Sequence, residues 1–146
     1  KTKRIIPTIM DYRHHIKEGS MLNTPPVFAV YVCLLTLRWL KEQGGIPEME
    51  KRNEIKASLL YHAIDESNLF QTTVSKEDRS FMNVCFTLKD AALEKPFLEY
   101  AKNNGIIGIK GHRLSGGFRA SLYNALPLES VQVLTGLMKS FEELSA

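Results

Sequence analysis

Helical spacing of apolar residues recurs in four stretches of the chain. The first runs from Val27 to about Gln43, is apolar on most of its faces, and stops at a pair of glycines. The other three cover about 47–65, 96–103 and 127–144, and each opens at a proline. Because the first helix is apolar nearly all round, we expect it to be buried on several sides.

The second and fourth of these helices each carry a single apolar stripe, which marks the candidate core. A stripe with spacing i, i+3, i+4 packs against one neighbour, while polar residues cover the opposite side of the helix. The stripe positions are Ile55, Leu59, Leu60, Ala63 and Ile64 in the second helix, and Val131, Leu134, Leu137, Met138, Phe141 and Leu144 in the fourth.

Alternation of apolar and polar residues, which is typical of a strand, occurs in the middle of the chain. Residues 82–88 alternate over their full length. We expect 106–109 and 120–123 to be two short partner strands joined by a turn. The start of the chain differs, because 4–10 looks extended and a polar loop follows it through Gly19.

The predicted order of elements is helix, helix, strand, helix, strand, strand, helix. This order indicates an α/β protein with an α+β-like small domain. We expect a long connecting helix followed by a small, mostly antiparallel sheet with helices packed on one face.

The composition is that of an ordinary globular protein, and the charge argues against nucleic acid as a partner. The 146 residues include 19 basic and 16 acidic ones, for a net charge of +3, with 44% hydrophobic residues. The basic residues near the start are not interleaved with aromatic residues, as a base-stacking surface would need. The longest apolar stretch, 27–37, is about half of a membrane span, so we expect no membrane partner.

The two cysteines, Cys33 and Cys85, both lie in apolar runs. They show no spacing typical of a disulfide or a metal site, so we expect buried free thiols in a reducing compartment. No signal peptide is recognisable. Because the sequence starts with Lys1 rather than Met, we also expect a fragment of a longer protein or a chain whose start was removed.

The segment 111–124 holds the most informative group of polar residues. Arg113 and Arg119 offer planar forks of donors that match carboxylate and phosphate oxygens. His112 adds a donor whose charge can change near neutral pH, and a pair of glycines before Arg119 lets the two forks converge. The segment is either a site for a small dianion that carries a phosphate and a carboxylate, or a basic hairpin with solvated arginines.

Asn23 and Thr24 lie where a loop meets the start of the first long helix. A helix N-terminus offers free N–H groups and a positive dipole, so this place suits a bound anion. The alternative is ordinary N-capping by Thr24. His14 and His15 are adjacent in sequence and do not share a face, so we expect solvated side chains and no metal site.

Five blocks of the sequence resemble the phosphoserine aminotransferase family. They occur in the order and with the spacing that the family shows, and together they cover nearly the whole chain. Leu22 and Phe118 depart slightly from the commonest family sequence, at positions where size rather than chemistry matters. The blocks are Pro7–Tyr12, Ser20–Pro26, Trp39–Lys41 with Gly44 and Gly45, Arg79–Val84, and Lys110–Ala125.

The resemblance implies a division of the chain. Residues 1–45 would be the end of the cofactor-binding large domain and the connecting helix, and 46–146 would be the C-terminal small domain. The family binds pyridoxal phosphate as a Schiff base to a lysine of the large domain, which would lie upstream of Lys1. The resemblance therefore implies no catalytic residue in this chain.

The resemblance also implies roles for five residues of this sequence. Family enzymes are homodimers with active sites at the subunit interface, so Asn23 and Thr24 would contact the cofactor phosphate of the neighbouring subunit. Arg119 would bind the substrate α-carboxylate. His112 and Arg113 would bind the phosphate end of phosphoserine.

Together with the anion motif, the resemblance predicts part of a cytoplasmic transaminase of serine biosynthesis, inactive as this chain alone. The complete enzyme would move an amino group between phosphoserine plus 2-oxoglutarate and phosphohydroxypyruvate plus glutamate. Its partners would be a phosphorylated amino acid, a 2-oxo acid and a second copy of itself. Two other classes stay open: a free-standing small-anion-binding regulatory module without catalysis, and a basic nucleic-acid binder, which the modest charge disfavours.

Overall fold

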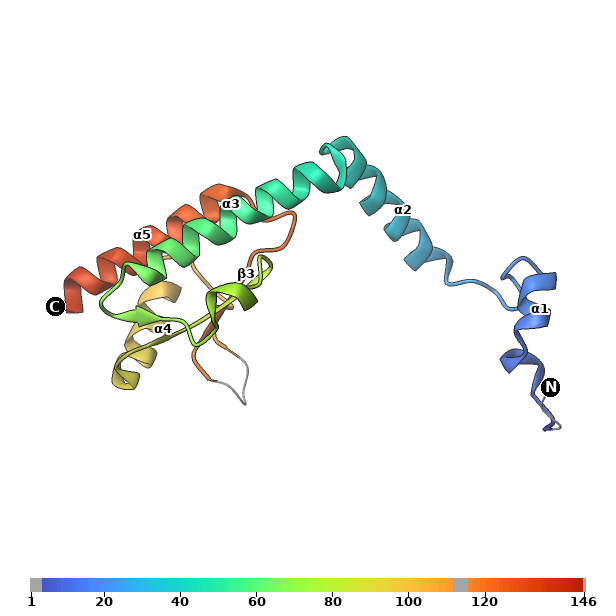
Figure 1. Ribbon diagram of the computed structural model, residues 1–146, viewed down its shortest axis with the longest axis horizontal. Coiled ribbons are helices and arrows are strands. Elements are labelled where there is room, and N and C mark those ends of the chain that lie inside the picture. Colours follow the sequence, from blue (N-terminus) through green and yellow to red (C-terminus); the bar gives the residue numbers. More distant parts are fainter. Residues whose placement is uncertain (1–3, 112–115, 146) are drawn as a thin grey trace. The chain divides into compact units, whose positions relative to one another are not determined.

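The computed structural model describes residues 4–111 and 116–145 of the chain (Figure 1). The chain divides into two compact units, Lys1–Glu42 and Gln43–Ala146. The assignment of 1–45 and 46–146 to parts of two different domains stays a prediction.

The first unit opens with two short helical pieces that the sequence analysis missed. A 3₁₀ turn, η1, spans Thr8–Met10, and helix α1 spans Tyr12–Lys17. Asp11 caps α1, because its carboxylate accepts hydrogen bonds from the backbone N–H of Arg13 at 3.1 Å and from Arg13 Nε at 2.8 Å. The expectations of an extended piece and a polar loop are therefore wrong here: a cap, and not an apolar stripe, starts this helix.

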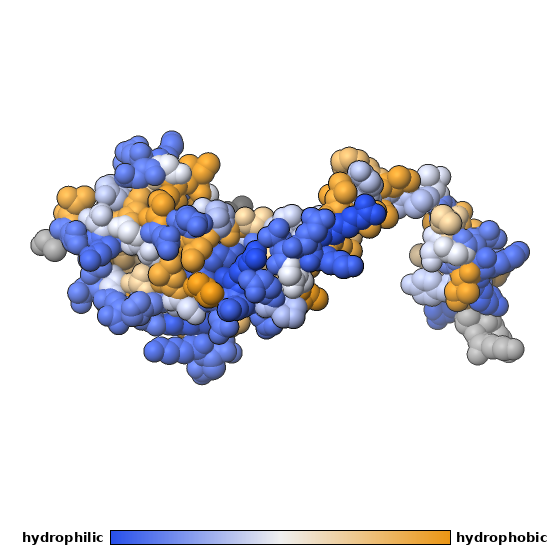
Figure 2. Space-filling model, turned by 90° about the horizontal axis from the view of Figure 1, so that it is seen from above, coloured by the Kyte–Doolittle hydropathy of each residue, from blue (hydrophilic) through white to orange (hydrophobic). Residues whose placement is uncertain are grey.

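Helix α2, Val27–Glu42, matches the first predicted helix in its span but not in its burial. None of its residues is buried, and Phe28 is 81% exposed. Figure 2 shows apolar side chains on its surface, and Cys33 is exposed as well. The expectations of a helix buried on several sides and of a buried Cys33 are therefore wrong for the described chain, whose first unit contains no buried residue.

The three helices predicted for the second unit are confirmed. They are α3 over Gly45–Asp65, α4 over Glu94–Asn103 and α5 over Leu128–Ser145. All predicted stripe positions of α5 are buried except Leu144, which is 73% exposed near the end of the helix. Two 3₁₀ turns complete the helical elements, η2 over Lys76–Asp78 and η3 over Ala91–Leu93.

Within the described residues, three strands form an antiparallel sheet in the order β1-β2-β3. Strand β2, Asn83–Leu88, confirms the strand predicted over 82–88. Strand β3, Phe118–Ser121, begins two residues before the strand predicted over 120–123. Strand β1, Phe70–Gln71, was not predicted. In place of the strand expected over 106–109, the described chain has an isolated bridge between Lys110 and Phe118.

The helices cover one face of this sheet, as predicted, and α3 and α5 lie side by side over it (Figure 1). Along β2, Val84, Phe86 and Leu88 are buried in the core. Cys85 occupies an outward position of the same alternation and is exposed, so the expectation of a buried thiol is wrong here too. The predicted fold class, mixed α/β with a small antiparallel sheet, is confirmed.

Phe97 of α4 lies at the centre of a group of aromatic rings that joins the sheet to the helices. Its ring centroid is 4.9 Å from that of Phe70, 5.1 Å from that of Phe118 and 5.1 Å from that of Phe141, all in edge-on geometry. Such pairs contribute about 0.5–1.5 kcal/mol each beyond their burial. Because Phe118 belongs to β3, this group fixes the strand against α4 and α5.

The core-facing side of α3 differs from the predicted stripe. Leu60 and Ile64 are buried as predicted, but Ile55 is 46% exposed, and Leu59 and Ala63 are only half-buried. The true stripe is rotated about the helix axis, because two polar residues take core positions. The buried positions are Met49, Asn53, Lys56, Ala57, Leu60, Tyr61 and Ile64.

Candidate functional site

Arg119 lies in β3 on the face of the sheet opposite to the helices. Its neighbours Phe118 and Ala120 are buried in the core, so the alternation of the strand directs the Arg119 side chain the other way. In the β2–β3 register Arg119 stands opposite Cys85, which is exposed on the same face. An exposed guanidinium in this position can bind a carboxylate through two parallel hydrogen bonds.

A small pocket of about 150 Å³ borders Arg119 on this face. Its lining includes Thr73, Cys85 and Thr87, and no acidic residue among those the structure describes. The hydroxyl oxygen of Thr87 is buried without a hydrogen-bond partner within residues 4–111 and 116–145. A guanidinium and hydroxyl groups without a nearby carboxylate favour an anionic ligand.

Two backbone hydrogen bonds close the turn that precedes Arg119. The N–H of Gly111 donates to the carbonyl oxygen of Gly117 at 2.8 Å, and the N–H of Arg119 donates to the carbonyl oxygen of Ile109 at 2.8 Å. Gly117 has a φ of 59°, and a Cβ there would lie 2.7 Å from the carbonyl oxygen of Phe86, so only glycine fits. The backbone of Arg119 is therefore held both by its own turn and by β2.

His112 and Arg113, the other two residues of the predicted anion site, lie outside the described residues. Gly111 and Gly116, which flank 112–115 in the sequence, both line the pocket beside Arg119. The role of His112 and Arg113 in phosphate binding stays a prediction.

Asn23 and Thr24 belong to the first unit and are exposed just before α2. The helix begins at Val27, so Thr24 is not its N-cap residue, and the capping alternative is wrong. Pro25 and Pro26 carry no N–H, and the N–H of Val27 donates to the carbonyl oxygen of Pro25 at 2.8 Å. The amide and hydroxyl donors of the two side chains fit a phosphate group, but free helix amides contribute less than the sequence indicated.

His14 and His15 lie on α1 and not in the expected loop. The Nε2 atom of His15 is 2.7 Å from the carbonyl oxygen of Ile9, and that of His14 is 3.9 Å from a carboxylate oxygen of Asp11. In the part of the chain that the structure describes, no group of three or more His, Cys, Asp or Glu side chains could hold a metal ion.

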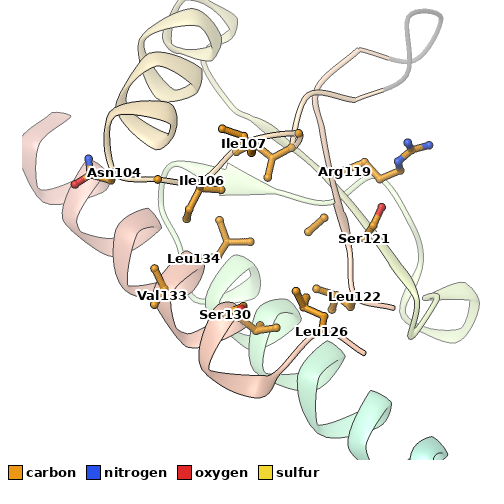
Figure 3. A pocket seen from close by; sticks show the side chains of 15 residues that line it. Asn104, Ile106, Ile107, Arg119, Ser121, Leu122, Leu126, Ser130, Val133 and Leu134 are labelled. Carbon is orange, nitrogen blue, oxygen red and sulfur yellow. The ribbon is translucent and has the colours of Figure 1, made fainter. Parts of the chain in front are cut away.

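A larger cavity of about 390 Å³ lies on the other side of β3, between the 104–109 segment and the start of α5 (Figure 3). Its walls include the aliphatic side chains of Ile106, Val133 and Leu134. Figure 3 shows the guanidinium of Arg119 pointing away from this cavity. An anion would find few donors there, so the candidate site is the smaller pocket on the opposite face.

Arg119 was predicted from the sequence as a site residue, whereas Thr73, Cys85 and Thr87 were not. The alternation of β2 indicates the positions of Cys85 and Thr87, because side chains between buried positions of a strand face the opposite side of the sheet. Thr73 follows the two-residue strand β1, and no pattern in the sequence indicates its position.

Residues 3–134 match the family model of class-V aminotransferases, and the chain belongs to this family. It is 57% identical over 141 residues to the phosphoserine aminotransferase of Porphyromonas gingivalis, and 53% identical over 147 residues to that of Phocaeicola vulgatus. The matches cover 95% and 99% of this chain but 39% and 41% of those proteins. The chain therefore spans about two fifths of the length of the curated relatives it matches.

Solved structures show the same likeness. The phosphoserine aminotransferase from Bacillus circulans subsp. alkalophilus superposes with a TM-score of 0.89 at 40% identity, over 97% of this chain and 39% of that chain. A PLP-bound phosphoserine aminotransferase from Trichomonas vaginalis superposes with a TM-score of 0.83 at 38% identity, over 95% and 40% of the two chains. Within the described residues, no helix has the length and apolar character to cross a membrane.

Proposed function

We propose that this chain is the C-terminal part of a phosphoserine aminotransferase, which moves an amino group between phosphoserine and 2-oxoglutarate. Its family membership and its identity to two enzymes of that name support this assignment. The observation in the chain itself that carries the proposal is Arg119, an exposed guanidinium beside a pocket lined by hydroxyl groups, on a backbone fixed by Gly117.

Arg119 is the group that we assign to the α-carboxylate of the substrate. Phosphoserine, glutamate and the two 2-oxo acids all carry a carboxylate next to the reacting carbon. A guanidinium fork holds a carboxylate by two charge-assisted hydrogen bonds and thereby fixes its orientation. This contact serves both halves of the reaction, because both use the same carboxylate.

His112 and Arg113 are assigned to the other end of the substrate, the phosphate. A phosphate dianion carries more charge than the side-chain carboxylate of glutamate, so two cationic groups favour phosphoserine. The position of Gly111 and Gly116 at the pocket of Arg119 supports this assignment, since these two glycines flank 112–115 in the sequence.

Asn23 and Thr24 are assigned to the phosphate group of pyridoxal phosphate in the neighbouring subunit of a homodimer. Their exposed side chains offer hydrogen-bond donors that suit a phosphate group, which supports this assignment. When bound, pyridoxal phosphate supplies the electron sink that amino-group transfer needs. This chain holds the cofactor phosphate and orients the substrate. The lysine that binds the cofactor covalently belongs to the rest of the protein, so the chain alone is inactive. The complete enzyme works in the cytoplasm.

Arg119→Lys in the complete protein tests the proposal. The substitution keeps the charge but removes the fork, so we expect kcat/KM for phosphoserine to fall about ten- to a few hundredfold. Arg52→Lys, on the exposed side of α3, is the matched control and should change it little. Binding of phosphoserine by the complete protein without any turnover would instead favour the anion-binding regulatory module.

A further inference from the structure

Lys56 is a buried lysine of α3 that faces the segment directly after β3. Its side chain is almost fully enclosed, with 3% of the residue exposed. Its Nζ donates hydrogen bonds to three backbone carbonyl oxygens, those of Leu122 at 3.3 Å, Tyr123 at 2.8 Å and Leu126 at 3.1 Å. An ammonium group has three N–H donors, so these carbonyls use all of them.

The same segment is held at two further points. Asn53, which is buried one turn earlier on α3, donates from Nδ2 to Oδ1 of Asn124 at 2.8 Å. Just before β2, the carbonyl oxygen of Met82 accepts a hydrogen bond from the N–H of Leu122 at 2.7 Å. Residues 122–126 are therefore fixed between α3 and the sheet by directional bonds.

An apolar side chain could fill the volume of Lys56 but could not bond to these carbonyls. Burial lowers the pKa of Lys56, which means that the fold opposes the charge that it keeps there. A methionine of similar volume would avoid this desolvation cost, but it would leave the three carbonyl oxygens without the donor that Lys56 supplies, and an acceptor that loses its partner in this way is costly. What methionine cannot do is fix the position of three carbonyl groups, because dispersion contacts lack the directionality of hydrogen bonds.

The segment that Lys56 holds continues directly from the strand that carries Arg119. β3 ends at Ser121, and Leu122 is the next residue. At the other end of the strand, the turn at Gly117 holds the backbone. A strand fixed at both ends keeps its side chains in constant directions. The hydrogen bonds that fix residues 122–126 therefore also help to fix the direction of Arg119 at the small pocket.

We propose that Lys56 is a positioning residue for Arg119: its contacts with the carbonyls of Leu122, Tyr123 and Leu126 fix the end of β3 and hence the direction of the guanidinium. The inference rests on the proposed function, in which Arg119 binds the substrate α-carboxylate. Lys56 itself touches no substrate, because it lies on the opposite side of the strand, in the core.

Lys56→Met in the complete protein is the first test, with steady-state kinetics in both substrate directions. We expect KM for phosphoserine and for glutamate to rise together, by about tenfold, because both substrates present the same carboxylate to a misplaced guanidinium. Lys51→Met, at an exposed position of the same helix, is the matched control and should leave both KM values unchanged. A lysine that only stabilised the fold would lower the melting temperature and leave KM unaltered in the folded protein.

A double-mutant cycle shows whether the effect passes through Arg119. In the Arg119→Lys background, Lys56→Met should raise KM by less than about twofold, because the contact that Lys56 positions has already been lost. The inference would be overturned if the KM increases of the two single variants multiplied in the double variant. An unchanged KM in Lys56→Met alone would overturn it as well. If Lys56→Met does not fold, Lys56→Gln, which keeps two N–H donors, and Asn124→Ala take its place with the same outcomes. An Arg119→Lys variant with unaltered kinetics would refute the proposed function itself, whereas an effect of Arg119→Lys without one of Lys56 would refute only the positioning role.

Discussion

Arg79 and Asp65 form a two-pronged ion pair between the loop before β2 and the last turn of α3. The Nη1 and Nη2 atoms of Arg79 donate to the two carboxylate oxygens of Asp65 at 2.8 and 2.7 Å. The guanidinium carbon also lies 4.5 Å from the ring centroid of Tyr61, whose hydroxyl donates to the carbonyl oxygen of Ser80 at 3.1 Å. These contacts anchor the loop that leads into β2, the strand that stands opposite Arg119.

The Arg79–Asp65 pair predicts a pH-dependent contribution to stability. The hydrogen bonds from Arg79 hold the pKa of Asp65 below its ordinary value of 3.8. A carboxyl group whose pKa is lower in the folded state adds stability above its unfolded pKa, and this stability is lost as the pH falls through the folded pKa. We expect Asp65→Asn to lower the free energy of unfolding by about 1 kcal/mol at pH 7, and by less below about pH 4.

Denaturant unfolding at pH 7 and pH 3 measures this difference. Glu54→Gln, at an exposed position of α3, is the control for removing one acidic charge from the same helix. A loss of stability in Asp65→Asn that is equal at both pH values would show that the ion pair is not its source.

Gly117→Ala should damage both stability and anion binding. The new Cβ would lie 2.7 Å from both the carbonyl oxygen of Phe86 and the Cγ2 of Thr87, at a backbone φ of 59°. We expect a loss of about 1–3 kcal/mol from the strained backbone, measured by thermal unfolding. Gly136→Ala is the matched control, because a Cβ at this helical position meets nothing within 4 Å. This substitution should raise the free energy of unfolding by roughly 0.5–1 kcal/mol. Equal stability in Gly117→Ala and the unmodified chain would contradict the tight closure of the turn.

Arg113 and Arg119 should divide the substrate between them in the complete protein. Arg119→Lys should impair phosphoserine and glutamate alike, since Lys cannot replace the fork that holds the shared carboxylate. Arg113→Ala should impair phosphoserine more than glutamate, by about ten- to a few hundredfold in kcat/KM. The measurement is kcat/KM for each half-reaction in both variants. The division of roles is wrong if Arg113→Ala affects both substrates equally, or if Arg119→Lys spares one.

Thr24→Ala should weaken the binding of pyridoxal phosphate in the complete protein. A lost charge-assisted hydrogen bond is worth about 1.5–3 kcal/mol, which corresponds to a roughly ten- to hundredfold weaker affinity. Thr36→Ala is the control, because the Thr36 hydroxyl bonds to the carbonyl oxygen of Val32 within α2, at 2.9 Å. Titration of the cofactor into the complete variant proteins measures the change, and an unaltered affinity in Thr24→Ala would exclude the assigned contact.

Periodicity predicted most of the second unit, and its failures have physical causes. The apolar patterns located α3, α4, α5 and β2, because these elements bury one side against the core. Helix α1 escaped notice because a polar cap starts it. The predicted stripe of α3 was rotated because Asn53 and Lys56, two polar residues, take core positions by bonding to the segment after β3.

Only the part of the candidate site that lies in the segment 111–124 could be predicted from the sequence. Arg119 could be identified from its neighbours along the chain, whereas Cys85 and Thr87 reach the same pocket from another strand, about thirty residues earlier. Their place depends on strand register, which a single sequence fixes poorly. The local apolar neighbours of Cys85 suggested burial, although the alternation that they form points the thiol outward.

The closure of the turn between Gly111 and Gly117 separates a constant part of the pocket from a replaceable one. The bonds at its base tie residues 109–111 to 117–119 without involving the residues between the glycines. Under the proposed function, insertions or exchanges in that interval should change the preference for the far end of the substrate and keep the contact of Arg119 with the α-carboxylate. Under that function, a related enzyme with another substrate could differ in this interval while the strand with its arginine is inherited unchanged.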